Sequence, residues 1–406
     1  MIWSVAWRNI WRNKQRSLIV IFSIVIGLVG GTFTAAFIIG MGEQTINATI
    51  NNEVSHIQIH HPKYLENDET QYYINNAAAI SDFIRKINGV KAVSERTKVV
   101  GMVNSASFTS GVQIVGIDPD VEIKVTAIHS LIKDTCGEYF KGVKKNPVVI
   151  STKLAEKLNV KVHSKIVLQF AKSDGTIQME AFKVSGLYKT SNTNFDLSDV
   201  FVRNIDLADS GRQYFRTHEI AILMNNKDSV GHVVSTLKSK FPELSVMTWK
   251  EIQPELGLFE DMSKVELYII LGIILFALAF GIVNTMLMAV LDRVHEIGML
   301  MAIGMSKIKI FRMIMQETVL LTLTGGVIGM AISWLLIVAV HKHGIDLSSV
   351  SKGMEAFGVE AIIYPALSAE YYFNVTIMIL MTGLLASIYP AIKALKLNPV
   401  EAIRQE

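Results

Sequence analysis

The sequence is poor in the residues and motifs on which most enzymes and metal sites depend. It has one cysteine, Cys136, which excludes an intramolecular disulfide and a C-x-x-C redox or metal site. It contains no G-x-x-x-x-G-K-[ST], H-E-x-x-H or G-x-S-x-G segment, so the common nucleotide-binding, zinc-protease and serine-hydrolase signatures are absent. His56, His60 and His61 cluster without further ligands nearby, and we interpret them as surface residues rather than a zinc site. The sequence therefore predicts a protein that is not an enzyme, with no catalytic residue, cofactor or metal.

Charge is also scarce. Only 18% of the 406 residues are charged, 50% are hydrophobic, and the mean hydropathy is positive. This composition is typical of a membrane protein that carries a substantial soluble part. The net charge of +3 is too small to indicate binding to nucleic acid.

Four long apolar stretches predict membrane-spanning helices. A hydrocarbon core of about 30 Å needs about 20 helical residues at 1.5 Å per residue, and each stretch approaches or exceeds that length. The predicted spans are residues 18–41, 265–291, 313–340 and 372–389, and the last is expected to end at Pro390. Glu317 lies about a turn inside the third span, and we interpret it as an acid that snorkels to the cytosolic edge or bonds a neighbour.

Small residues recur four positions apart in two of these spans. Gly27 and Gly31 lie in the first span, and Gly325, Gly326 and Gly329 lie in the third. This spacing allows two helices to pack closely in a membrane. The contact is either within one chain or between two copies, and the sequence favours neither.

Residues 42–264, between the first two spans, predict a large α+β domain. Its two ends carry similar βαβ patterns, each with two strands around an amphipathic helix. The first half comprises residues 54–60, 77–87 and 91–100, and the second comprises residues 219–224, 229–240 and 245–249. A β-rich insertion separates them, with strands at 112–117, 148–150, 165–170 and 177–187, a helix at 151–158 capped by Ser151, and a turn at 173–175. The predicted fold class is an α-helical membrane protein with four transmembrane helices plus this extracytoplasmic α+β domain of two βαβ halves with a β-rich insertion.

The distribution of lysine and arginine predicts the orientation. Residues 1–16 form a candidate amphipathic helix, with a tryptophan stripe beside an arginine stripe, which suits a cytosolic membrane interface. The loop at 292–312 and the C-terminal tail are also rich in basic residues, so both termini and this loop are predicted to be cytosolic. The domain at 42–264 would then lie outside the cytosol.

A short polar helix is predicted between the second and third spans, at residues 292–306. Asp292 is a candidate N-cap, Gly304 stands where a helix C′ glycine belongs, and Ser306 can cap the following helix. Taken alone, the segment is a cytosolic connection between two spans.

This helix and several other segments resemble the MacB/FtsX-like permease superfamily of ABC transporters. The helix is similar to the family's coupling helix, which docks into a groove of the ATPase, and the motif is carried by Arg293, Glu296, Ile297, Gly298, Leu300 and residues 302–306. The resemblance implies that Arg293, Glu296, Ile297, Gly298, Leu300 and Gly304 couple the permease to the ATPase. Met301 stands where the family often has a basic residue. Residues 6–27 resemble the family's basic opening, 113–119 its extracytoplasmic domain, and 389–404 its closing signature, so the resemblance extends along the chain.

The resemblance implies a transmembrane permease subunit of an ABC transporter in the bacterial inner membrane, with both termini cytosolic and the large domain periplasmic. A separate ABC ATPase subunit would hydrolyse ATP, and an identical or paralogous permease subunit would complete the assembly. The implied domains are 1–41, with the cytosolic amphipathic helix and the first span, 42–264, the extracytoplasmic domain, and 265–406, the FtsX-like permease domain.

The size and order of the segments are most similar to the lipoprotein-releasing permeases. This similarity implies a lipoprotein substrate and a periplasmic carrier as a further partner. Candidate contacts with the acyl chains lie on the first two spans, at Phe33, Phe37, Ile38, Leu267, Ile270 and Ile274. The hairpin at 171–180 occupies the region where those permeases carry a hook for the carrier, although it has no clear apolar tip in this sequence. The alternatives are a mechanotransmitting exporter of drugs or peptides, a cell-division-type signalling permease, and a receptor for an external ligand.

Overall fold

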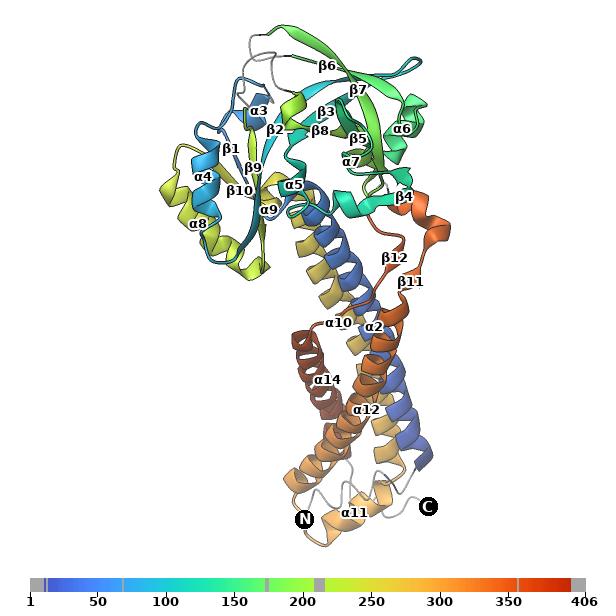
Figure 1. Cartoon of the computed structure of the whole chain (residues 1–406). Helices are drawn as coiled ribbons and strands as arrows, with labels where there is room; N and C mark the ends of the chain where they lie inside the picture. Colours follow the sequence, from blue (N-terminus) through green and yellow to red (C-terminus); the bar gives the residue numbers. More distant parts are fainter. Residues whose placement is uncertain are drawn as a thin grey trace. The chain divides into compact units, whose positions relative to one another are not determined.

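The computed structural model describes Trp11 and residues 14–67, 69–171, 175–207, 216–355 and 358–395. The chain divides into two compact units, whose elements are labelled in Figure 1. The first, called the membrane unit below, comprises Met1–Gly42, Glu260–Asp346 and Ile362–Glu406. The second, called the β-rich unit, comprises Glu43–Phe259 and Leu347–Ala361. Most of the predicted amphipathic helix at 1–16, most of the turn at 173–175 and the tail beyond residue 395 lie outside the described residues.

Four helices in the described part of the chain are long and apolar enough to cross a membrane, which confirms the predicted number of spans. They are α2 (Lys14–Thr49), α10 (Pro254–Leu291), α12 (Lys307–His343) and α14 (Ala369–Leu395). The first two extend well beyond the apolar stretches, because no proline interrupts the polar turns that flank them and Pro254 is acceptable in the first turn of α10. The short helix α11 (Val294–Ala302) connects α10 to α12.

The sequence predicted that the fourth span ends at Pro390, and this prediction is wrong. Helix α14 continues to Leu395 with Pro390 inside it. A proline in a helix removes only its own N–H bond and keeps φ near −65°, so a buried and well-packed helix can continue through it. Ala386, Ala391 and Ala394 pack into the core of the membrane unit around Pro390, and this packing explains why the helix persists.

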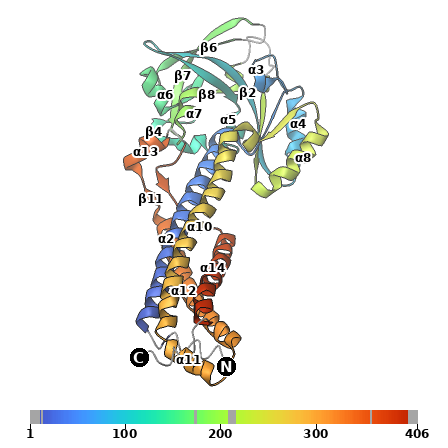
Figure 2. The same cartoon turned by 180° about the vertical axis from the view of Figure 1, so that it is seen from behind.

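The small residues of the first and third spans make contacts within this chain. A Cβ atom added at Gly31 would lie 2.8 Å from Cδ1 of Ile274 on α10. One added at Gly329 would lie 2.9 Å from Cδ1 of Leu28 on α2. The glycines therefore let α2 pack closely against both α10 and α12, which resolves the alternative that the sequence left open. Figure 2 shows α2 and α10 side by side from the opposite direction.

The β-rich unit contains one ten-stranded sheet, in the order β10-β1-β9-β2-β3-β8-β5-β7-β4, with β6 paired to β2 and β7. The first four strands and two helices form a ferredoxin-like lobe, in which neighbouring strands are antiparallel. Its elements are β1 (Ile57–His60), α4 (Ala77–Ile84), β2 (Val90–Asn104), β9 (Glu219–Met224), α8 (Val230–Lys240) and β10 (Ser245–Thr248). Both predicted βαβ halves are thereby confirmed. The first strand begins later than predicted, because helical structure continues through the π-helix η1 (Ile50–Val54).

Both faces of the ferredoxin-like sheet are covered. Helices α4 and α8 lie together on one face of the sheet (Figure 1). Their apolar side chains pack there on alternate strand residues such as Ile57, Ile220 and Ile222. The other face receives the end of α2, the π-helix η1 and Trp249 of α9 (Trp249–Ile252), which pack on Ala221 of β9. Successive side chains of a strand in this sheet therefore point to two faces that are both buried.

The predicted β-rich insertion forms the other lobe of the same sheet. Its strands are β3 (Thr109–Ile117), β4 (Ile132–Gly137), β5 (Pro147–Ser151), β6 (Lys165–Ala171), β7 (Ile177–Tyr188) and β8 (Asp199–Arg203). Its helices are α5 (Pro119–Glu122), α6 (Thr152–Leu158) and α7 (Thr193–Ser198). The Ser151 cap is confirmed, since its Oγ accepts a hydrogen bond from the Leu154 N–H at 2.9 Å. Strand β2 joins the lobes, because its first part pairs with β9 and its second part with β3 and β6.

A segment between the third and fourth spans folds onto the β-rich unit. Leu347–Ala361 contains η5 (Ser348–Val350) and α13 (Ser351–Met354), and Glu355 pairs with Lys153 at 2.7 Å and with Lys189 at 3.0 Å. The Thr193 hydroxyl donates to the Glu355 carbonyl at 3.0 Å. The implied permease domain at 265–406 includes this segment, whereas in the structure the segment belongs to the β-rich unit. The lysine pair draws it onto the insertion lobe.

Candidate functional site

Helix α11 is a short, well-terminated helix between two spans. It ends in a Schellman motif, in which the Gly304 N–H donates to Met301 O at 3.1 Å and the Met305 N–H donates to Leu300 O at 2.9 Å. Gly304 has φ +97°, which confirms its predicted place as the C′ glycine. The predicted N-cap is wrong: Arg293 occupies that position, because the Asp292 N–H still bonds to Met288 O of α10.

Ser306 lies at the start of α12, as predicted. Its backbone carbonyl accepts from the Lys309 N–H at 2.9 Å, so it occupies the N-cap position. Its hydroxyl makes no capping hydrogen bond. The turn from α11 to α12 is therefore set by the backbone of residues 303–306, with Gly304 as the residue that permits it.

An ion pair holds the start of α11 against α12. Nη1 of Arg293 lies 3.1 Å from Oε1 and 3.3 Å from Oε2 of Glu317, and the Glu317 side chain is only 9% exposed. The interpretation that Glu317 bonds a neighbour is confirmed, and the neighbour belongs to the coupling-helix motif. A small cavity of about 130 Å³ lies beside this pair and is lined by residues of α10, α11 and α12, among them Glu296, Ile297 and Leu300.

The predicted coupling residues do not all face the same way. Ile297 and Gly298 are buried, and Glu296 and Leu300 are half-buried. The exposed face of the helix consists of His295, Met299, Ala302 and Ile303. None of these was among the predicted coupling residues, although Ala302 and Ile303 belong to the motif. Ile303 is 84% exposed, which is unusual for a large apolar side chain. The spacing of 295, 299 and 302 along one helical face was the signal that could have identified them.

The predicted acyl-chain contacts are partly or fully covered by the rest of the protein. Leu267 is buried, and the other five residues, Phe33, Phe37, Ile38, Ile270 and Ile274, are half-buried. Ile274 packs against Gly31. The exposed apolar side chains of α10 lie on other faces and include Tyr268, Ile269, Ile273, Phe276 and Phe280.

An apolar face lies on the sheet of the insertion lobe. Met102 of β2, Gln169 of β6 and Met179 of β7 lie opposite one another, and Ala171 of β6 pairs with Ile177 of β7 two residues along the strands. Val100 lies two residues before Met102 on β2 and therefore on the same face of the sheet. Ile177 and Met179 are 65% and 64% exposed. These apolar residues lie on adjacent strands of the sheet and not at the turn of the hairpin, so the prediction that the turn has no apolar tip is not contradicted. We call Val100, Met102, Ile177 and Met179 the apolar sheet face.

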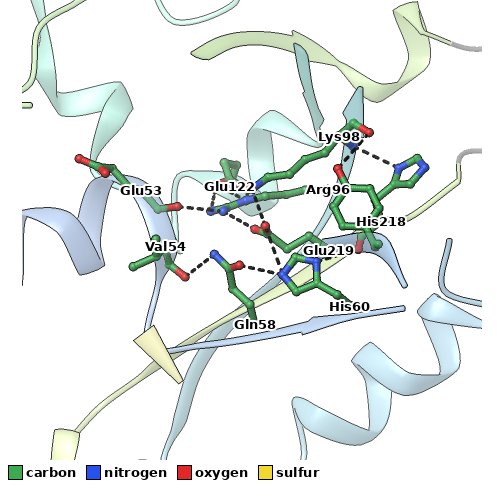
Figure 3. A network of polar contacts seen from close by, with 10 residues as sticks. Glu53, Val54, Gln58, His60, Arg96, Lys98, Glu122, His218 and Glu219 are labelled. Carbon is green, nitrogen blue, oxygen red and sulfur yellow. Dashed lines mark hydrogen bonds and ion pairs between the residues drawn. The ribbon is translucent and has the colours of Figure 1, made fainter. Parts of the chain in front are cut away.

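A buried polar row crosses the ferredoxin-like sheet (Figure 3). His60, Glu219 and Arg96 are directly opposite one another on β1, β9 and β2. Nη1 of Arg96 lies 2.7 Å from Oε1 of Glu219, and Nζ of Lys98 lies 2.6 Å from Oε2. Burial would raise the pKa of Glu219, but Lys98 and Arg96 outweigh it and hold this pKa at about 2.

The interpretation of the histidines as surface residues is wrong for His56 and His60, which are both buried. The reason is that the second face of the sheet is covered by the end of α2 rather than by solvent. Nε2 of His60 contacts Gln58 Oε1 at 2.8 Å, so the ring belongs to the polar row. Among the described residues, no group of His, Cys, Asp and Glu side chains could hold a metal ion.

The chain has four apolar helices, a short helix between the second and third of them, and an α+β unit after the first. Similarity to known protein families identifies the class of protein with this order of elements. The MacB-like periplasmic core domain family matches residues 17–240, and the FtsX-like permease C-terminal family matches residues 268–399. The chain therefore belongs to the MacB/FtsX-like family of ABC transporter permeases.

Individual relatives are distant but cover much of the chain. YknZ of Bacillus subtilis (strain 168), named as an uncharacterised ABC transporter permease, is 24% identical over 99% of this chain and 98% of its own. LolC of Xylella fastidiosa (strain Temecula1), a transmembrane protein of a lipoprotein-releasing system, is 25% identical over 72% of each chain. The crystal structure of the periplasmic region of MacB from Actinobacillus actinomycetemcomitans aligns with 53% of this chain and 98% of that one, at 12% identity and a TM-score of 0.36.

Proposed function

We propose that this permease is one of two copies or paralogues in its transporter and that a separate ABC ATPase docks on α11. The observation that carries the proposal is the Arg293–Glu317 pair, which fixes α11 to α12 while Met299 and Ile303 stay exposed. A rigidly held helix with outward apolar anchors suits a groove on another protein. Glu296 and Leu300 would flank the contact, and Ile297 and Gly298 would support it from behind.

The proposed mechanism is mechanical transmission. ATP binding would bring two ATPases together and move the α11 helices docked on them. Because α2 packs against α10 at Gly31 and against α12 at Gly329, movement of the two helices that flank α11 would reach α2. Helices α2 and α10 both continue into the β-rich unit and would carry the stroke to it.

The proposed substrate is a lipoprotein of the inner membrane. Each buried CH₂ of an acyl chain contributes about 0.8 kcal/mol, so extraction from a bilayer is far uphill and needs ATP. The apolar surfaces of α2 and α10 are suited to contact the chains, with Phe33, Phe37, Ile38 and Ile270 becoming accessible when the two helices separate. The likeness to LolC supports this substrate.

The apolar sheet face is the proposed docking surface for a periplasmic carrier that takes the released lipoprotein. Its methionines are adaptable apolar side chains, which suit a partner surface. A carrier for acylated cargo must itself offer an apolar surface, so the two would be complementary.

Depletion of the protein tests the substrate. Outer-membrane lipoproteins should accumulate in the inner-membrane fraction, and wild-type protein should restore their sorting. The variant Met102→Lys/Met179→Lys should fail to restore it, whereas Ile205→Lys, which changes an apolar residue outside the apolar sheet face that is at least as exposed, should succeed. Normal sorting together with sensitivity to an exported drug or peptide would replace lipoprotein release with the exporter function.

The proposed orientation places both termini in the cytosol and the β-rich unit in the periplasm. A reporter that is active only in the cytosol should be silent when inserted at the exposed turn residue Gly175 and active when fused after Glu406. Activity at Gly175 would reverse the orientation and remove the coupling role of α11.

A further inference from the structure

The end of α2 is built differently from the rest of the helix. After Thr49 the chain continues as the π-helix η1, and Ser55, with φ 60°, then turns it into β1. Ile46, Ile50 and Val54 pack this end against the ferredoxin-like sheet. Single π turns inside or beside α-helices occur often at functional sites, and this one lies where a membrane helix enters the sheet.

The last carbonyl groups of η1 are held by side chains of the sheet. Nη1 of Arg96 donates to Glu53 O at 3.2 Å, and Nε2 of Gln58 donates to Val54 O at 2.8 Å (Figure 3). Carbonyl groups at the end of a helix have no partner within it, so an external donor fixes their position. Both donors are almost fully buried.

Arg96 cannot move independently of the sheet. Its Nη2 lies 2.6 Å from Oε1 of Glu122, its Nε lies 3.1 Å from the same oxygen, and its Nη1 is paired with Glu219. Releasing the guanidinium would leave the buried Glu122 carboxylate without the cation it pairs with and would leave Glu219 with Lys98 alone, which is strongly unfavourable. The end of α2 is therefore tied, through Arg96, to β2, β9 and α5.

Glu53 makes two further connections through its side chain. Nδ2 of Asn192, the N-cap of α7, donates to Oε1 at 3.0 Å, and Nε2 of Gln253 donates to Oε2 at 3.4 Å. Gln253 directly precedes α10. One residue of η1 thus contacts the ferredoxin-like lobe, the insertion lobe and the start of the second membrane helix.

We propose that residues 50–58 form a rigid joint that makes the β-rich unit move together with α2, with Arg96 and Gln58 as its positioning residues. The inference rests on the proposed function, in which α2 carries the movement produced by the ATPase. A helix end held only by apolar packing could rotate or slide under the sheet. Buried directional bonds to two carbonyl groups prevent this, because any rotation breaks them without a replacement from water.

Distances between spin labels in the full-length protein, with its co-purified ATPase, test the joint. In a Cys136→Ser background, a first pair at Asn47 and Lys238 reports on α2 against the ferredoxin-like lobe. A second pair at Thr34 and Met381 reports on α2 within the membrane unit. All four positions are exposed. When the ATPase is trapped with ATP and vanadate, we expect the second distance to change and the first to stay constant.

Two variants should loosen the joint in different ways. Gln58→Leu keeps the volume but removes the bond to Val54 O, and Arg96→Lys keeps the charge but shortens the reach to Glu53 O. In either variant the trapped state should give a shifted or clearly broadened Asn47–Lys238 distance and loss of transport, with ATP hydrolysis retained. The matched control is Ser185→Ala, which removes a buried bond to Val148 O in the insertion lobe and should behave as wild type.

The outcomes separate this proposal from the proposed function. If the Thr34–Met381 distance does not respond to trapping, α2 does not carry the stroke and the proposed function fails. If that distance responds but the Asn47–Lys238 distance also changes in wild-type protein, α2 moves independently of the sheet and the rigid joint is refuted. Constant distances in both variants would equally show that Arg96 and Gln58 do not position the helix.

Discussion

Replacing one partner of the Arg293–Glu317 pair should destabilise the membrane unit more than replacing both. The two side chains are 13% and 9% exposed, so each has lost most of its hydration. At a separation of 3.1 Å and an effective dielectric constant of about 20, their attraction is about 5 kcal/mol. Much of this attraction only offsets the lost hydration. A single replacement removes the attraction and leaves the other charge buried, which costs about 3–5 kcal/mol.

A double-mutant cycle measures the effect. The variants are Arg293→Met, Glu317→Leu and their combination, and the readout is the free energy of unfolding by sodium dodecyl sulfate in mixed micelles, followed by tryptophan fluorescence. The double variant should be close to wild type, so the coupling energy should equal the sum of the two single effects, about 6–10 kcal/mol. Arg312→Met, an exposed arginine on the same helix, should change stability by less than about 0.5 kcal/mol. The prediction would be refuted if Arg293→Met and Glu317→Leu were each as stable as the Arg312→Met control. It would also be refuted if the losses of stability of the two single variants simply added in the double variant.

Three further predictions concern other parts of the molecule. Ile303→Asp should abolish co-purification of the ATPase while membrane insertion is unchanged, and an unchanged yield of the complex would show that α11 does not dock through this face. Gly40→Ala should destabilise the membrane unit by about 1–3 kcal/mol, because its Cβ would press on the Tyr364 carbonyl, while Gly30→Ala, with open space around it on the same helix, should be neutral or stabilising. The Glu219 carboxyl has a pKa of about 2 in the folded protein against an ordinary 4.5, so its charge adds stability above pH 4.5 that is lost as the pH falls towards 2. Amide hydrogen exchange of β9 should therefore show that Glu219→Gln loses about 3 kcal/mol of protection at pH 7 and has a flatter acid dependence than wild type; a parallel pH dependence would contradict this.

The membrane helices could be predicted from the sequence because their signal is local. An apolar stretch long enough to span a bilayer must satisfy its backbone internally and so forms a helix regardless of its neighbours. The position of Gly304 is local as well, since a residue with positive φ directly after a helix favours glycine. The two βαβ halves could be predicted for the same reason. In each, the spacing of apolar residues changes from that of a strand to that of a helix and back within a short segment.

The direction in which individual residues face was harder to predict, because it depends on contacts between helices. The predicted coupling residues include Ile297 and Gly298, which are buried, and leave out Met299 and Ile303, which are exposed. A motif identifies a helix but does not distinguish residues that support it from residues that meet a partner. Pro390 was misread for a related reason: the packing of α14 overrides the tendency of proline to end a helix.

The polar row of the β-rich unit could not be predicted from the sequence, because it depends on how distant segments pair. His60, Arg96 and Glu219 come from segments far apart in the chain, and only the strand register brings them opposite one another. The alternating pattern of β1 indicates one apolar and one polar face, and the usual inference is that the polar face meets water. Here the end of α2 covers that face instead, so its polar side chains are buried and must find partners within the protein. The carbonyl groups of η1 are among those partners, because a helix that ends under a sheet needs donors that water cannot supply. The burial that made the polar row unpredictable from the sequence also places Arg96 and Gln58 where they donate hydrogen bonds to the helical segment that follows α2.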